Sequence, residues 1–217
     1  MSEAQEISIS KEHITEAYVA YFERNGQRPV NMLSFCREAK LSEGQVYPVF
    51  SSLDRIEQAC WEQLFEEVVQ KLHEDDTFRQ YSVREKTLAF FFTFFQDALP
   101  HRSFVLATAG SLREPKLLHW KHFKHGFKEF FRSLAEEAVE REELPSRFNM
   151  QRFYAEGAWV QFLFLINFWM NDDSEGFVST DEAIERSVHL IFDLGANRTL
   201  DQGLDFARFL FRNYRKS

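Results

Sequence analysis

The chain is poor in residues that cross-link or interrupt a fold. Its 217 residues include two cysteines, Cys36 and Cys60, five prolines and eight glycines. Two cysteines cannot build a disulfide framework, and their spacing matches no zinc-binding pattern. The scarcity of turn-forming residues and the long, non-alternating apolar segments argue against an all-β fold. These absences favour an all-α protein with reduced thiols.

The sequence also lacks a segment suited to a membrane. The longest nearly apolar run, residues 159–170, is too short to span a bilayer and contains Gln161 and Asn167. The first residues are acidic and carry no apolar core of a signal peptide. We therefore expect a cytoplasmic protein that makes no contact with membranes.

An excess of basic charge is missing too. The formal net charge is −8, and residues 1–60 hold six basic against nine acidic residues, a net charge of −3. Phosphate contacts provide most of the non-specific affinity of DNA-binding proteins. Any contact with DNA must therefore come from a local basic surface rather than from overall charge.

Patterns typical of enzymes are absent from the sequence. It contains no nucleophile with a paired base, no glycine-rich phosphate loop and no His-Glu-x-x-His motif. The triplet His119, His122 and His125 invites a metal interpretation, but ligands at i, i+3 and i+6 diverge around a helix and lysines surround them. We expect no metal, no cofactor and no catalysis. The basic cluster is interpreted as a solvated face or, as the alternative, a contact for an anionic group at a pocket mouth.

What the chain has in abundance is aromatic residues, which make up 16% of it and include 25 phenylalanines. The helix expected from about Arg84 is apolar all round and should be buried on every side. A long helix predicted from Pro115 to about Glu143 carries one aromatic stripe, and a third aromatic helix covers about residues 149–170. Most of these rings should form core, yet such rings with a few polar groups also line ligand sites. The residues predicted to bind an apolar or aromatic small-molecule effector are Phe91, Phe95, Trp120, Phe123, Phe127, Tyr154, Trp159, Gln161, Phe162 and Asn167.

Capping signals divide the rest of the chain into helices. A serine, threonine, asparagine or aspartate followed three residues later by a hydrogen-bonding partner predicts a helix start. A final helix is predicted at residues 204–214. The predicted N-caps are Ser10, Asn31, Ser42 with Gln45, Ser51 with Asp54, Ser82 with Glu85, and Ser179 with Glu182.

The segment at residues 38–50 is the most informative, because it reads as a helix end, a tight turn and a second short helix. The following residues fall in step with one known pattern: Gly26, Asn31, Phe35, Cys36, Ala39, Leu41, Ser42, Gly44, Val46, Tyr47, Phe50, Ser52 and Ile56. With this spacing the chain resembles the tetracycline-repressor (TetR) family of bacterial regulators. The resemblance implies an all-α homodimer with a helix-turn-helix domain at residues 1–52 and a ligand-binding and dimerisation domain at residues 53–217.

The resemblance also implies roles for single residues. Ser42 would cap the recognition helix beside a phosphate, Gln45 would face base edges, and Tyr47 would donate to a phosphate of a double-stranded DNA operator. Arg28 and Asn31 would lie at a helix N-terminus that binds a phosphate, and Lys40 would belong to the same surface. The expected dimer interface consists of Ala183, Ile184, Ser187, Val188 and Ile191, and the alternative is that this helix face packs within the chain.

Four residues depart from the family pattern. Lys40 replaces a glycine, Pro48 interrupts the recognition helix, and Val49 and Leu53 stand where phosphate-binding residues are usual. The sequence therefore leaves two functions open. One is a ligand-responsive transcriptional regulator, expected to be a repressor. The other is a small-molecule or lipid-like binding protein on the same scaffold with weak or lost DNA binding.

Overall fold

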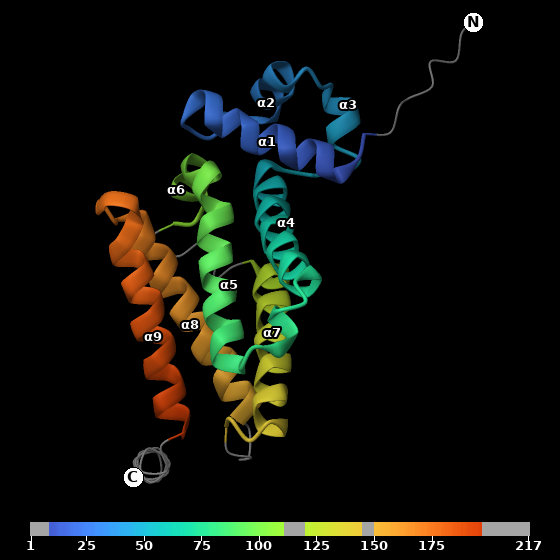
Figure 1. Ribbon diagram of the computed structural model, residues 1–217. Coiled ribbons are helices and arrows are strands. Elements are labelled where there is room, and N and C mark those ends of the chain that lie inside the picture. The colour runs from blue at the N-terminus through green and yellow to red at the C-terminus, as the bar shows by residue number, and fades with distance from the viewer. Residues whose placement is uncertain (1–8, 111–119, 145–149, 197–217) are drawn as a thin grey trace, which may run out of the picture.

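The fold was taken from a computed structural model that describes residues 9–110, 120–144 and 150–196. Within these ranges every regular element is a helix, as predicted (Figure 1). The α-helices are α1 (Lys11–Asn25), α2 (Met32–Ala39), α3 (Glu43–Val46), α4 (Leu53–Glu74), α5 (Val83–Ala98), α6 (Arg102–Thr108), α7 (Lys121–Glu140), α8 (Met150–Met170) and α9 (Val178–Ala196). Short 3-10 turns are η1 (Phe78–Gln80), η2 (Leu99–His101) and η4 (Glu175–Phe177).

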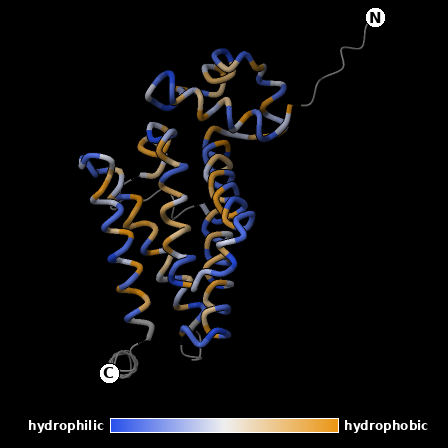
Figure 2. The backbone as a smooth tube through the Cα atoms, viewed as in Figure 1, coloured by the Kyte–Doolittle hydropathy of each residue, from blue (hydrophilic) through white to orange (hydrophobic). Residues whose placement is uncertain are grey.

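The helices form a small head and a longer body. The head consists of α1, α2 and α3 at one end of the molecule, and α4 leads from it into the body (Figure 1). In the body, α7 packs along α8, while α5 contacts α4 and α9. Hydrophobic and hydrophilic positions alternate along these helices in the manner of amphipathic helices (Figure 2). The predicted domain boundary at residues 52 and 53 stays a prediction, because α4 packs against both α1 and α5.

The helix starts of the head follow local capping rules. Ser10 accepts from the His13 N–H to cap α1, which ends where Gly26 adopts a left-handed φ of 64°. One predicted cap is wrong by a residue. Ser52, and not Ser51, caps α4 by accepting from the Arg55 N–H.

Two further helix starts differ from their predictions. The backbone of Trp120 has ψ 85°, so α7 begins at Lys121 instead of continuing a helix from Pro115. Pro115, like the predicted final helix at residues 204–214, lies outside the described residues. The second difference concerns α9, which begins at Val178, before the predicted cap Ser179.

The side chain that satisfies the start of α9 comes from the preceding loop. Asp172 Oδ2 accepts from the backbone N–H of Thr180 at 2.9 Å and from its hydroxyl at 2.6 Å. These bonds lower the pKa of Asp172 to about 2, with the Thr180 hydroxyl as the main cause. A carboxylate eight residues upstream thus replaces the expected local cap.

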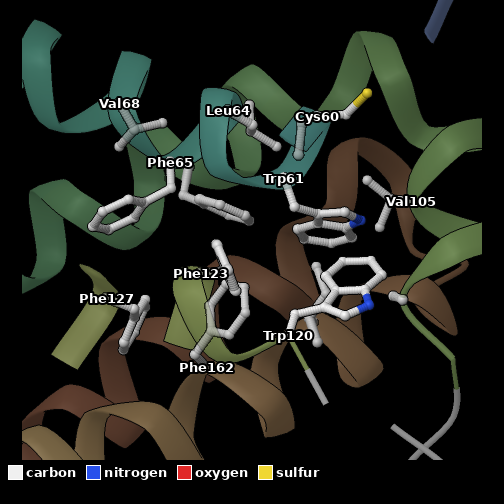
Figure 3. Packing of buried hydrophobic residues seen from close by; sticks show 14 of the residues in the cluster. Cys60, Trp61, Leu64, Phe65, Val68, Val105, Trp120, Phe123, Phe127 and Phe162 are labelled. Atoms are coloured by element: carbon white, nitrogen blue, oxygen red, sulfur yellow. The ribbon is translucent and has the colours of Figure 1, made fainter. Parts of the chain in front are cut away.

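Aromatic rings from four helices, α4, α5, α7 and α8, fill the body. Trp61 and Phe65 of α4 face Phe123 and Phe127 of α7, and Phe162 of α8 lies against them (Figure 3). Ring centroids are 5.9 Å apart for Trp61 and Phe123, and 5.0 Å apart for Phe127 and Phe162. Each fully buried phenylalanine contributes roughly 1.5–3 kcal/mol relative to an exposed one.

The expectation that α5 is buried on every side holds only in part. Phe90, Phe91, Phe94 and Phe95 are buried, whereas Phe92 is half-buried. The face of α5 that carries Phe92 is therefore not completely covered within one chain.

Candidate DNA-reading surface and effector site

The turn between α2 and α3 has the geometry of a helix-turn-helix. Asn31 caps α2 through the Ser34 N–H at 2.9 Å. The chain then reverses at Lys40, which adopts a left-handed φ of 57°, and the Leu41 N–H donates to the carbonyl of Cys36 at 2.8 Å. Ser42 starts α3 immediately afterwards, as the sequence predicts.

The recognition helix α3 is a single turn that ends before Pro48. Gln45 Oε1 accepts from the Ser42 N–H at 2.9 Å and from its hydroxyl at 3.0 Å, so the predicted capping box is formed. The same bonds occupy the oxygen that a bidentate adenine contact requires. A bidentate contact of the Gln45 amide with adenine would require these hydrogen bonds to Ser42 to break.

Arg28 is paired with two carboxylates of the chain, and its contact with a DNA phosphate stays a prediction. Its Nε donates to Glu57 Oε1 at 2.6 Å and its Nη2 donates to Asp54. The hydroxyl of Tyr18 donates to the same Glu57 oxygen at 2.9 Å. The Glu57 side chain is 2% exposed, and the ion pair joins α4 to the loop before α2.

Burial and the charges of this network shift the pKa values of Tyr18 and Arg28. Burial raises the pKa of the Tyr18 hydroxyl above its ordinary value, and the Glu57 carboxylate raises it further. Burial lowers the pKa of Arg28, but the opposing charge of Glu57 leaves it raised overall. Arg28 therefore remains a cation that is committed to holding α4.

The other predicted DNA-binding residues lie on the outside of the head. Asn31, Lys40 and Ser42 are exposed, and Tyr47 is 49% exposed. Two exposed cations lie outside the predicted set, Arg37 at the end of α2 and Arg55 in the first turn of α4. Nothing in the family pattern marks these two residues, since only the fold places them at the end of α2 and at the start of α4.

Most of the residues predicted to bind an effector meet in the body. Trp159 contacts Phe123, Phe127 and Phe162, with ring centroids 5.8, 5.3 and 5.7 Å away. Trp120 packs on Trp61 at 5.8 Å. These rings fill the space between α4, α7 and α8 by touching one another.

The predicted polar members of this site are satisfied inside the chain. The hydroxyls of Tyr154 and Thr87 lie 3.0 Å apart, and Gln161 Nε2 donates to Ser187 Oγ at 2.8 Å. Burial raises the pKa of Tyr154. Asn167 lies half-buried near the end of α8, where its backbone carbonyl accepts from the Asn171 side chain.

Comparison with known families decides the identity of the chain. The family model described as "Tetracyclin repressor-like, C-terminal domain" matches residues 86–210, more than half of the chain. The chain belongs to the tetracycline-repressor family. TetR-family regulators are typically non-enzymatic DNA-binding proteins that bind small-molecule ligands as dimers.

Solved structures with the same fold include several regulators. FadR from Bacillus subtilis in complex with stearoyl-CoA has a TM-score of 0.62 at 16% identity, covering 82% of this chain and 97% of that chain. The fatty acid degradation regulator FadR from Bacillus halodurans has a TM-score of 0.59 at 15% identity, covering 87% and 95%. A regulatory protein in the TetR family from Rhodococcus RHA1 has a TM-score of 0.53 at 12% identity, covering 88% and 98%. No curated protein matches the chain.

The residues predicted to form the dimer interface differ in how deeply they are buried within one chain. Ile184 and Val188 have no exposed surface within one chain, which corrects their assignment to the interface. Ala183, Ser187 and Ile191 are half-buried. Exposed apolar residues outside the predicted set lie on α8, where Phe153, Val160 and Phe164 are 54%, 64% and 46% exposed, and on α9, where Val178 and Leu190 are exposed as well.

Two surface grooves of this TetR-family chain lie where head and body meet. One has a volume of about 430 Å³ and is lined by residues of α1, α4 and α7, including Arg55 and His122. The other, of about 250 Å³, runs between α1, α4 and Phe104 of α6. Beside the second groove, His101 Nδ1 lies 3.1 Å from Glu23 Oε1, a contact between the body and α1.

Neither a metal site nor a membrane span emerges from the parts of the chain that the structure describes. No three His, Cys, Asp or Glu residues there gather as metal ligands would. His122 and His125 lie exposed on α7, and His119 lies outside the described residues. No described helix is both long and apolar enough to cross a bilayer.

Proposed function

We propose that this TetR-family protein is a transcriptional repressor whose operator binding responds to an apolar or aromatic effector. The observation that carries the proposal is the capped helix-turn-helix, with α3 and its exposed neighbours Lys40 and Tyr47 at the outer end of a ligand-binding fold. Tyr47 and Asn31 would fix the head on phosphates, while Gln45 would read a base edge.

The effector would act through the aromatic cluster. Phe123 of α7 touches both Trp159 of α8 and Trp61 of α4. A ligand that inserts beside Trp159 would displace Phe123 and therefore press on α4. Because Glu57 on α4 holds Arg28 and Tyr18, the head would follow the movement of α4. Effector and operator would then favour different spacings of two heads, which is a population shift.

The nature of the effector is supported by the composition of the cluster. Phe123, Phe127 and Phe162 offer flat apolar surface, which suits an aromatic or aliphatic body. The FadR structure from Bacillus subtilis, which contains stearoyl-CoA, shows that a chain of this fold accommodates a molecule with a long apolar part.

The functional unit would be a homodimer. The exposed residues Phe153, Val160 and Phe164 follow one another on a single face of α8, at helical spacing. An apolar stripe of this kind on a monomer marks an interaction surface. Ala183 and Ser187 of α9 are small enough to let a second copy approach closely.

The proposal is tested by measuring DNA binding across a salt series. The full-length protein would be titrated by fluorescence anisotropy into DNA from upstream of its own locus and into a shuffled fragment of equal composition. We expect preference for the native fragment and an affinity that falls with salt concentration, because bound cations of the phosphates are released. Tyr47→Phe should weaken binding to both fragments. An equal affinity for both fragments at about 50 mM salt would falsify operator recognition.

One specific feature favours the alternative of a ligand-binding protein with weak or lost DNA binding. Arg28 is bound by two carboxylates, and α3 is only four residues long. The head therefore offers fewer contacts to DNA than the motif spacing in the sequence predicts. The salt series separates the two functions, because this alternative predicts no sequence preference while effector binding persists.

A further inference from the structure

The indole N–H of Trp159 is buried without a hydrogen-bond partner. Trp159 is 2% exposed, and its Nε1 is the one side-chain N or O atom in the described part of the chain that is both buried and unpartnered. In contrast, the equally buried Trp61 donates its Nε1–H to Thr108 Oγ1 at 2.9 Å. Buried indoles usually find an acceptor, so the orphan donor calls for an explanation.

The neighbours of Trp159 offer it no acceptor. Its ring contacts are the phenylalanines 123, 127 and 162, which carry no polar atoms. The amide of Gln161 nearby in the sequence is bonded to Ser187 of α9. The donor therefore lies unpartnered on a ring that three phenylalanines contact, in the region where an effector has been proposed.

A cation lies on the same indole. Lys124 Nζ is 5.6 Å from the centroid of the Trp159 ring, and the lysine is half-buried. Among the described residues no carboxylate lies within 4.0 Å of this ammonium group. The carboxylate of Glu156 is taken by Lys128 at 2.5 Å, and that hydrogen bond is the main cause of the lowered pKa of Glu156.

We propose that Trp159 Nε1 and Lys124 Nζ together recognise a carboxylate on the effector, an apolar acid whose body inserts among the phenylalanine rings. The inference rests on the proposed function and names the chemical class of its effector. An N–H donor and an ammonium group both bind an anion, and bonds to charged acceptors are the stronger kind. A neutral apolar molecule would leave the indole donor unsatisfied.

The surrounding charge supports an acidic ligand. Lys121, His122 and His125 lie exposed on the first two turns of α7, on the helix that carries Lys124. The ammonium groups of Lys121 and Lys124 attract anions by long-range electrostatics. The basic cluster of α7, interpreted from sequence mainly as a solvated face, thus becomes the approach to the acid-binding site.

The experiment compares acids with neutral analogues of the same body. Isothermal titration of the full-length protein would use decanoate with decan-1-ol and naphthalene-2-carboxylate with naphthalene-2-carboxamide. We expect at least one acid to bind about tenfold or more tightly than its neutral analogue, the size expected for a hydrogen bond to a charged group. Trp159→Phe and Lys124→Met should each reduce that difference severalfold, whereas the control Lys71→Met, which removes a lysine of α4 that pairs with Asp97, should leave it unchanged.

The outcomes separate this inference from the proposed function. Equal binding of acid and neutral analogue, or variants that leave the preference intact, overturns acid recognition but keeps an effector site. Absence of binding by both acids also overturns acid recognition. The proposed function is then tested separately by the DNA-binding assay. If Trp159→Phe unfolds the protein, the half-exposed Lys124→Met variant still decides the outcome.

Discussion

At the scale of single residues, Arg28 illustrates how a side chain predicted to bind DNA acquires a structural role. Among the residues that the structure describes, replacing Arg28 with alanine leaves the buried carboxylate of Glu57 with the Tyr18 hydroxyl as its one partner. We expect the free energy of unfolding to fall by roughly 1–3 kcal/mol, the cost of leaving a buried polar group without its partner, because only the Glu57 half of the ion pair is buried. Chemical denaturation measures this loss.

Two variants control this prediction. Arg24→Ala breaks the exposed pair with Glu38 and should change stability by less than about 0.5 kcal/mol. The double variant Arg28→Ala with Glu57→Gln should recover part of the loss, because no uncompensated charge remains buried. A double variant as unstable as the sum of its single changes would contradict the ion-pair interpretation.

Asp172 gives a pH dependence whose sign follows from its lowered pKa. The pKa is 3.8 in an unperturbed aspartate and about 2 in the folded chain. The stabilisation by Asp172 is therefore complete above pH 3.8 and is lost as the pH falls toward about 2. We expect the stability difference between wild type and Asp172→Asn to shrink across this window in urea titrations. A difference that stays constant from pH 5 to pH 2 would argue against a charged cap on α9.

At the scale of elements, the turn between α2 and α3 combines a strained backbone with a possible DNA contact. Lys40 has a left-handed φ of 57°, a conformation that costs a side-chain-bearing residue roughly 1 kcal/mol. Lys40→Gly should therefore be more stable than Lys40→Ala by about 1 kcal/mol in denaturant titrations. Both variants should lose the same amount of DNA affinity, since both remove the charge. Unequal DNA affinities at low salt would show that the turn conformation, and not the ammonium group, matters for binding.

Helix starts were the most predictable elements, and the reason is their short range. Each of four N-cap side chains accepts from the N–H three residues later, so a segment of four residues contains the whole interaction. These caps are Ser10, Asn31, Ser42 and Ser82. The start of α9 was mispredicted because its cap comes from Asp172 across a loop. Capping patterns in the sequence do not predict a helix start whose capping side chain comes from a residue farther away along the chain.

At the scale of the whole molecule, the exposed stripe on α8 predicts the oligomeric state. Val160→Glu combined with Phe164→Glu places two charges on that stripe, and we expect a monomer by light scattering coupled to size exclusion. Val30→Glu, at a 90% exposed position on the head, should leave the dimer intact. A dimer that survives both charges on α8 would move the interface elsewhere. A folded monomer should also bind operator DNA far more weakly, because it loses the second head.

The sequence by itself determined the all-α class, the helix-turn-helix spacing and the aromatic stripe of α7, all of which depend on residues within a few positions of each other. The tertiary structure alone decided which partner each side chain takes. It pairs Arg28 with Glu57, 29 residues away, and it buries the side chains of Ile184 and Val188 inside the protomer. It also left Trp159 Nε1 without an acceptor. Such outcomes depend on which helices meet and at which angle, because burial and hydrogen-bond satisfaction are properties of the packed chain.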